Sequence, residues 1–288
     1  MPTLTTDSMH VFLNGQVVPA SQAAISPFDI GLLRGYAVFD LLRTVGGRPF
    51  LLADHLKRLR ESAELLGLTV PYSDDEISSA IDELLSLNGH GEATVRLVLT
   101  GGPSADGMSF DPETPTFYIL THKLTPPPAS VYETGTKLIT RQHRREVPEA
   151  KTTSYLTMLR HRGDTVAEGA LDLLYHDGEC IAEAASASFY IVSEGTIRAP
   201  HSDVLWGTVG ALVLGLAAAD HEVVLGVVTL EDAFDADEAF LTSTTRGVVP
   251  IVQLDDRTIG DGKVGPVTRE LMEAYARVLQ DAEAAPEV

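Results

Sequence analysis

Three consecutive prolines, at positions 126–128, are the feature that most limits how this chain can fold. Proline has no backbone N–H and a fixed φ, so a run of prolines cannot continue a helix or a central strand. The chain has 288 residues, which is enough for two ordinary domains, each with its own core. We therefore predict an N-terminal domain over residues 1–122, a linker over 123–133 and a C-terminal domain over 134–288.

Helix and strand patterns mix in the N-terminal part. An Asn-Gly pair at residues 14–15 between two apolar runs is typical of a tight β-hairpin. Apolar residues recur at helical spacing over residues 53–66, and a Ser-x-x-Glu capping box opens a second helix over 73–87. Together with strands predicted at 36–45, 95–100 and 116–121, these patterns indicate a small α/β domain.

The C-terminal part has many short strand patterns and few long helical ones. The expected strands cover residues 136–142, 172–176, 179–183, 187–193, 222–228 and 238–243. The expected helices cover residues 152–168, 208–219 and 265–283. This balance predicts a larger, barrel-like domain.

Composition excludes several function classes. The formal net charge of -20 argues against binding to nucleic acid, which requires a basic face. No apolar run is long enough to span a membrane, and residues 1–10 lack the basic and apolar regions of a secretory signal. Cys180 has no second cysteine to pair with, so we predict a cytoplasmic protein. The excess of carboxylates also suggests adaptation to high salt.

Lys151 is the first candidate for chemistry. It is one of five lysines, and it follows a proline where the predicted helix begins. A lysine amine that condenses with an aldehyde forms a Schiff base, the usual anchor of pyridoxal phosphate. The alternative is a solvated surface lysine, so the case depends on the other motifs of the chain.

Five segments in order, including Lys151 itself, resemble the fold-type IV pyridoxal phosphate enzymes. The other four are Asp29-Ile-Gly-Leu-Leu-Arg-Gly-Tyr-Ala-Val-Phe-Asp40, His55-Leu-Lys-Arg58, Gly178-Glu-Cys-Ile-Ala-Glu183, and a pair of loops over 205–210 and 242–250. This family includes branched-chain aminotransferases, D-amino acid aminotransferases and aminodeoxychorismate lyases. The resemblance covers about residues 10–280 and implies a two-domain α+β fold that binds pyridoxal 5'-phosphate.

The resemblance implies a role for each matched residue. Lys151 would carry the cofactor and, once released, move the proton from the substrate α-carbon. Glu183 would pair with the pyridine nitrogen, although an ordinary acidic strand residue is the alternative. The remaining cofactor-binding candidates are Arg58, Tyr155, Gly207, Thr208, Val209 and Thr244. Tyr155 lies one helical turn after Lys151 in the predicted helix and would face the same way, or else pack in the core.

The chain departs from the family pattern at several positions. Asp40 replaces the usual glutamate, Trp206 replaces a proline, and Gly210 replaces an arginine of the phosphate loop. The loop over 101–108 has neither the arginine nor the histidine that the usual D-amino acid enzymes place there. Arg34 and Leu41 stand where the branched-chain enzymes favour tyrosine and glycine, so that pattern is also broken.

The substrate pocket is predicted from the same resemblance. Its candidate residues are Arg34, Phe39, Arg96, Arg144, Thr245 and Arg246. Arg34 and Arg246 could form a carboxylate clamp, or both could be surface arginines paired with the many carboxylates.

The clamp favours a D-amino acid transaminase with side activity on (R)-amines. An L-branched-chain aminotransferase is the alternative, followed by aminodeoxychorismate lyase, which generally lacks an acid at the position of Asp40. From another class, a cofactor-free binding protein on the same fold remains open. The family implies amino acid and 2-oxo acid substrates and a homodimer, with no metal.

Overall fold

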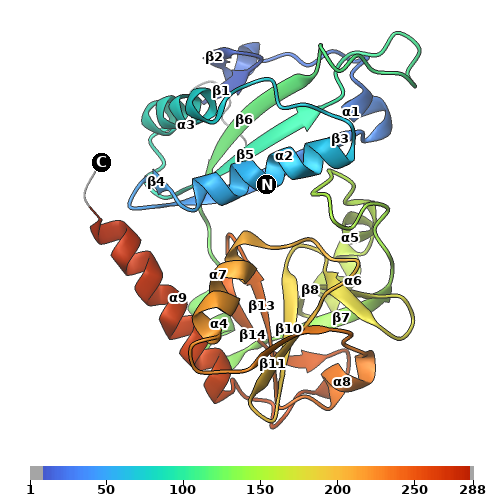
Figure 1. The fold of residues 1–288 in the computed structure, drawn as a ribbon, viewed down its shortest axis with the longest axis vertical. Helices are drawn as coiled ribbons and strands as arrows, with labels where there is room; N and C mark the ends of the chain where they lie inside the picture. Colours follow the sequence, from blue (N-terminus) through green and yellow to red (C-terminus); the bar gives the residue numbers. More distant parts are fainter. Residues whose placement is uncertain (1–8, 286–288) are drawn as a thin grey trace. The chain divides into compact units, whose positions relative to one another are not determined.

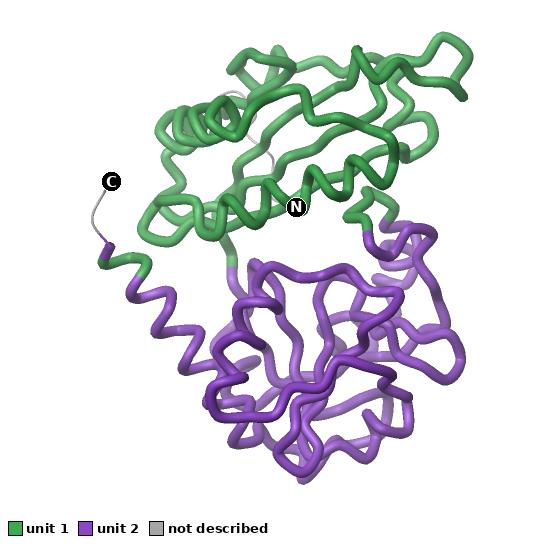
Figure 2. The backbone as a smooth tube through the Cα atoms, in the orientation of Figure 1, with its two compact units in different colours: residues 1–125, 150–154, 282–284 green, residues 126–149, 155–281, 285–288 purple. Residues whose placement is uncertain are grey.

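The computed structural model describes residues 9–285, in two compact units (Figure 2). Unit 1 comprises residues 9–125, 150–154 and 282–284, and unit 2 comprises residues 126–149, 155–281 and 285. The chain therefore passes from unit 1 to unit 2 where the proline run begins. The N-terminal segment for which we predict no secretory signal lies almost wholly outside the described residues.

Unit 1 is built on a six-stranded sheet in which every pairing is antiparallel. Its order is β2-β1-β6-β5-β3-β4. The strands are β1 (His10–Leu13), β2 (Gln16–Pro19), β3 (Ala37–Val45), β4 (Arg48–Pro49), β5 (Ala93–Thr100) and β6 (Thr116–Lys123). The predicted hairpin is confirmed: β1 pairs with β2, and Asn14 and Gly15 both have positive φ, as a tight right-twisted turn requires.

Two helices cover one face of this sheet (Figure 1). They are α2 (Leu52–Leu65) and α3 (Asp74–Asn88), and α3 begins with the predicted capping box of Ser73 and Glu76. Their apolar stripes share one core with alternate residues of β3, β5 and β6. The other face of β3 and β5 carries Phe39 and Arg96. The unit also has the short helix α1 (Ile30–Arg34) and a 3₁₀ turn at Ala20–Gln22, neither of which the apolar pattern predicts.

Unit 2 contains a nine-stranded sheet that curls around one core. The strand order is β12-β11-β10-β13-β14-β7-β8-β9, and β15 pairs with β14. The strands are β7 (Thr136–Gln142), β8 (Ala170–His176), β9 (Ile181–Ala184), β10 (Ser188–Ser193), β11 (Thr196–Pro200), β12 (Val223–Gly226), β13 (Glu238–Ser243), β14 (Gly247–Leu254) and β15 (Arg257–Thr258). Because residues from β7 to β10, β13 and β14 share this core, the sheet is barrel-like and the fold class is α+β, as predicted.

The helices of unit 2 are mostly short. They are α4 (Ala129–Thr134), α5 (Leu156–Arg160), α6 (Arg162–Ala167), α7 (Thr208–Ala217), α8 (Leu230–Phe234) and α9 (Pro266–Ala284), whose last three residues belong to unit 1. The segment 123–133, predicted as a linker, therefore holds most of α4. Over residues 9–285, no helix combines the length and the apolar character needed to cross a membrane.

The helix predicted over 152–168 is wrong at its start. Residues 151–155 are not helical, and only the two short helices α5 and α6 follow. The reason is tertiary: Thr152 forms a bridge with Val38, and the Thr153 N–H donates to Ala37 O at 3.1 Å. Strand pairing with β3 therefore outweighs the helical pattern, so no helical turn relates Tyr155 to Lys151.

Candidate active site

Lys151 lies in unit 1, although the residues on both sides of segment 150–154 belong to unit 2. The Phe39 N–H donates to Lys151 O at 2.9 Å, and the Lys151 N–H donates to Ser62 Oγ at 3.0 Å. Ser62 lies on α2 and is 1 % exposed. The backbone of Lys151 is therefore held from β3 on one side and from α2 on the other.

The side chain of Lys151 meets a buried aromatic ring. Its Nζ lies 4.9 Å from the centre of the Phe39 ring, and Cζ of Arg96 lies 4.8 Å from the same centre. Phe39 pairs with Val98 and Leu41 pairs with Arg96 across β3 and β5, so Phe39 and Arg96 share one face of the sheet. Two cations thus contact one ring, and an anionic group close to this ring would meet positive charge.

Arg58 belongs to a buried network on the helix-covered face. Its Nε and Nη2 each donate to a carboxylate oxygen of Asp40 at 2.8 Å, and His55 Nδ1 lies 2.7 Å from Asp40 Oδ1. Burial alone would raise the pKa of Asp40, but the Arg58 charge and the hydrogen bonds from His55 and Arg58 outweigh it and hold that pKa well below its usual range. Asp40 is therefore a carboxylate, and Arg58 is held in a fixed orientation.

Glu183 lies on β9 of unit 2 and is 7 % exposed. Arg145 donates from Nη2 to Glu183 Oε1, and the Leu205 N–H donates to Oε2 at 3.3 Å. Nearby Tyr175 is buried on β8, where burial and the charge of Asp172 raise its pKa. Tyr155 is the residue before α5, and a negative charge on its side chain would raise the pKa of Tyr175 further.

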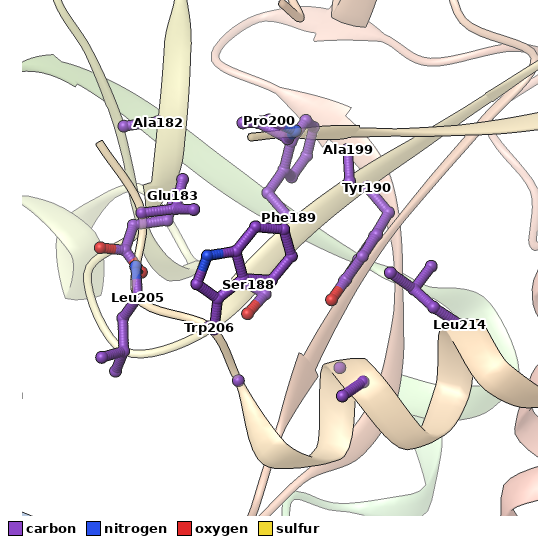
Figure 3. Close-up of a pocket in the computed structure, with 14 residues that line it drawn as sticks. Ala182, Glu183, Ser188, Phe189, Tyr190, Ala199, Pro200, Leu205, Trp206 and Leu214 are labelled. Atoms are coloured by element: carbon purple, nitrogen blue, oxygen red, sulfur yellow. The ribbon is translucent and has the colours of Figure 1, made fainter. Parts of the chain in front are cut away.

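The loop before α7 lines a small cavity of unit 2 (Figure 3). Figure 3 shows the Trp206 ring beside Glu183, and the hydroxyls of Ser188 and Tyr190 pointing toward the first turn of α7. A Cβ at Gly210 would lie 2.3 Å from Tyr190 Oη, so the arginine of the family pattern has no room here. The predicted residues Gly207, Thr208 and Val209 form the N-terminus of this helix, where backbone N–H groups favour an anion.

Thr244 and Thr245 lie in the turn between β13 and β14. The next residue, Arg246, donates to Ser243 Oγ at 3.0 Å and to Ser186 Oγ at 2.7 Å, and it lies 3.4 Å from Asp172 Oδ2. This arginine is 13 % exposed and Asp172 is 3 % exposed. Arg246 therefore holds the turn onto the body of unit 2.

The other two predicted arginines are on the surface. Arg34 ends α1, and its Nη1 donates to Leu33 O at 3.2 Å. Arg144 pairs with Asp203 at 2.5 Å, and its side chain is 67 % exposed. In unit 1, Phe39, Arg96 and Lys151 meet at one face of the sheet, and Arg58 lies on the helix-covered face. Unit 2 contains the remaining cofactor candidates with Thr245 and Arg246.

Sequence reasoning assigned no role to the residues that hold these groups. They are His55, Ser62, Arg145, Asp172, Tyr175 and Ser186. On α2, His55 lies three residues before Arg58, and Ser62 lies four residues after it. This helical spacing puts all three on one face, so the sequence contains a signal for His55 and Ser62 once Arg58 is a candidate.

The sequence and the fold match known proteins over most of the chain. A family model described as amino-transferase class IV matches residues 37–254. The chain is 32 % identical over 279 residues to a "Putative branched-chain-amino-acid aminotransferase" of Methanocaldococcus jannaschii, covering 93 % of this chain and 95 % of that one. It is 27 % identical over 290 residues to the D-alanine aminotransferase of Staphylococcus aureus, covering 94 % and 98 %.

A solved structure matches nearly the whole chain. It is the branched-chain amino acid aminotransferase of T.th. with pyridoxamine 5'-phosphate, with a TM-score of 0.85 and 26 % identity. The match covers 96 % of this chain and 95 % of the other. The known proteins that resemble this chain therefore include relatives named for branched-chain and for D-amino acid substrates.

Proposed function

The chain belongs to the class IV aminotransferases, which depend on pyridoxal phosphate, and we propose that it acts on D-amino acids. Its substrates are small molecules: an amino acid that gives up its amino group and a 2-oxo acid that receives it. The observation that supports an amino acid substrate is the position of Arg96, a candidate for the α-carboxylate, which contacts the same Phe39 ring as Lys151.

The residues present fit the cofactor. Lys151 supplies an amine for the aldehyde, Arg58 a buried guanidinium for the phosphate, and Glu183 a carboxylate held by Arg145 for the ring nitrogen. Within unit 2, the backbone and hydroxyl groups at Thr208 and Thr244 are further candidates to bind a phosphate. When bound, the cofactor withdraws electrons from the substrate α-carbon. The free Lys151 amine would move a proton from the α-carbon of the amino acid to the cofactor carbon that bore the aldehyde, and would move it in the reverse direction when the 2-oxo acid receives the amino group.

Arg96 would hold the substrate α-carboxylate. An arginine keeps its charge and offers a planar pair of donors to a carboxylate. The Phe39 ring would set the plane of the guanidinium. Arg34 of the predicted Arg34–Arg246 clamp is exposed at the end of α1, so we leave it out of the carboxylate site. Arg246 contacts Asp172 and Ser186, so we assign it the role of holding in place the turn that carries Thr244 and Thr245.

The preference for D-amino acids over L-amino acids is proposed from the relatives and from the departures from the branched-chain pattern. D-Alanine aminotransferases match nearly the full length of the chain. The branched-chain pattern is broken at Arg34 and Leu41. A branched-chain substrate is the second candidate, because the Methanocaldococcus jannaschii relative is named for that activity. A lyase that releases an aromatic amine is the third candidate.

The test mixes the pyridoxal-loaded protein separately with D-alanine and L-leucine and follows the absorbance of the lysine-bound cofactor. Loss of that absorbance with D-alanine alone supports the proposal. Loss with L-leucine alone would make the protein a branched-chain enzyme, and release of 4-aminobenzoate from aminodeoxychorismate would make it a lyase.

The role of Arg96 has its own test. We expect Arg96→Leu to lower kcat/KM for D-alanine at least about 30-fold, in line with roughly 2 kcal/mol or more for a desolvated charge pair. The same variant should keep activity on an (R)-amine, which has no carboxylate. Arg246→Leu should lower both activities together, because its effect passes through the turn. Equal losses of activity on D-alanine and on the (R)-amine in Arg96→Leu would show that Arg96 does not bind the substrate carboxylate.

The proposal includes a homodimer in the cytoplasm. The side chains of Phe28, Leu32 and Met108 are 66 %, 70 % and 71 % exposed in unit 1. Large exposed apolar side chains close to one another favour a protein interface. Leu33 and Arg34 on α1 lie within 4 Å of a Cβ built at Gly107, so α1 and the 103–110 loop form one surface that would meet a second copy.

A further inference from the structure

We propose that Asp40 and His55 are positioning residues for the cofactor phosphate: they fix Arg58, and through β3 and α2 they keep it in register with Lys151. This inference rests on the phosphate-binding role of Arg58 given under the proposed function.

Asp40 sets the orientation of Arg58. The Asp40 carboxylate accepts hydrogen bonds from Arg58 Nε and Nη2. This side-on pair of hydrogen bonds fixes both the plane and the rotation of the guanidinium. Asp40 is itself held by His55 and by the Leu41 N–H at 2.7 Å. Asp40 is 0 % exposed, His55 1 % and Arg58 8 %, so water cannot substitute for a lost partner.

Hydrogen bonds connect this network to Lys151. Arg58 and Ser62 are four residues apart on α2 and so lie on one face of the helix. Ser62 accepts from the Lys151 N–H, and Lys151 O accepts from the N–H of Phe39, the neighbour of Asp40 on β3. The contacts therefore form a closed circuit: Asp40, Arg58, helix α2, Ser62, Lys151, Phe39 and back to Asp40.

The shape of the ligand gives this circuit its purpose. The aldehyde and the phosphate of pyridoxal phosphate are held apart by one rigid ring. A protein that binds both ends must therefore hold the amine and the guanidinium at a set separation. The circuit does this within one unit, because both groups are tied to the same strand and the same helix. Pyridoxal, which lacks the phosphate, needs the amine alone.

The experiment measures the dissociation constants of the cofactor-free protein for pyridoxal phosphate and for pyridoxal, from the absorbance of the lysine-bound species. The variants are Asp40→Asn, Asp40→Glu, His55→Gln and Arg58→Gln. Arg60→Gln is the matched control, because Arg60 is on the same helix but pairs with exposed Asp74. The ratio of the two constants isolates the phosphate, since a loss of general stability weakens both ligands alike.

We expect Asp40→Asn to weaken pyridoxal phosphate about tenfold with little change for pyridoxal; in metal sites, losing an orienting partner weakens binding roughly 10- to 100-fold. Asp40→Glu keeps the charge but moves it by one methylene, so its ratio should lie between those of wild type and Asp40→Asn. His55→Gln leaves the Asp40–Arg58 pair in place and should shift the ratio less. It serves as the test if Asp40→Asn does not fold.

The outcomes separate the two claims. If Arg58→Gln changes the ratio but Asp40→Asn, Asp40→Glu and His55→Gln leave it at the wild-type value, the positioning role is wrong and the phosphate role of Arg58 stands. If Arg58→Gln also leaves the ratio unchanged, the assignment of Arg58 fails first. A ratio shift in Arg60→Gln as large as that in Asp40→Asn would also overturn the inference.

Discussion

Arg145 donates to one oxygen of the buried Glu183 carboxylate, and the other oxygen accepts the Leu205 N–H at 3.3 Å. The charge pair is enclosed: the Arg145 side chain is 17 % exposed and that of Glu183 is 9 % exposed. The orientation and the charge balance of Glu183 therefore depend on a residue that lies 38 positions earlier in the chain.

Replacing Arg145 with methionine should lower the free energy of unfolding by about 3 kcal/mol, because it removes the charged partner of a buried carboxylate. The matched control is Arg144→Met. Arg144 is 67 % exposed and pairs with Asp203 at the surface, where such a pair contributes at most about 1 kcal/mol. Urea unfolding of the cofactor-free protein measures both. An equal loss of unfolding free energy in the two variants would mean that the buried Arg145–Glu183 pair contributes no more to stability than the surface pair.

These neighbouring arginines show where sequence reasoning stops. Nothing in the residues around Arg144 and Arg145 says which one faces the core, because the segment between β7 and Lys151 has no regular structure and so no periodicity. The resemblance predicts Arg144 as a site residue, but the structure places Arg144 at the surface and pairs Arg145 with Glu183. Tertiary contacts alone decide this.

Short sequence motifs predict the structure correctly where interactions between residues close in the chain determine it. The capping box before α3 and the turn at Asn14 depend on residues within four positions of each other, and both are confirmed. The sequence does not predict strand β14 (Gly247–Leu254), because its start resembles a phosphate loop and its burial comes from neighbours far along the chain. The segment at Lys151 failed as a helix for the same kind of reason: β3 takes its hydrogen bonds.

The first turn of α7 should tolerate no side chain at Gly210. A Cβ there would lie 2.3 Å from Tyr190 Oη and 3.2 Å from Thr242 Oγ1, so Gly210→Ala must displace buried groups and should cost about 1–3 kcal/mol. Gly215 on the same helix has open space, so Gly215→Ala should stabilise by about 0.5–1 kcal/mol. Thermal unfolding of the two variants gives opposite signs if the close packing at Tyr190 is real. Stabilisation by both would contradict it.

Asp40 should make stability depend on acid pH. The pKa of Asp40 is lowered in the folded protein, where the charge of Arg58 and the hydrogen bonds outweigh burial, and lies near 3.9 in an unfolded chain. A lowered pKa means that the stabilisation is fully present above about pH 4 and is lost as the pH falls below that value. The difference in unfolding free energy between wild type and Asp40→Asn should therefore be constant from about pH 5 to 7 and shrink below about pH 4. A difference that grows in acid would contradict the ionised state of Asp40.

Salt should stabilise this protein at neutral pH. The chain has 41 acidic and 21 basic residues, a net charge of -20, so the folded state repels itself. Raising the ionic strength from about 0.1 M to about 1 M shortens the Debye length from about 10 Å to about 3 Å and screens that repulsion. We expect Tm at the higher of these two KCl concentrations to exceed Tm at the lower by at least about 3 °C, the shift that roughly 1 kcal/mol gives for a protein of this size. The control is the same pair of measurements near pH 4.7, the pI of the sequence, where the net charge is close to zero and the salt effect should vanish. A lower Tm at high salt and neutral pH would instead show that surface ion pairs, such as Arg60 with Asp74, outweigh the net repulsion.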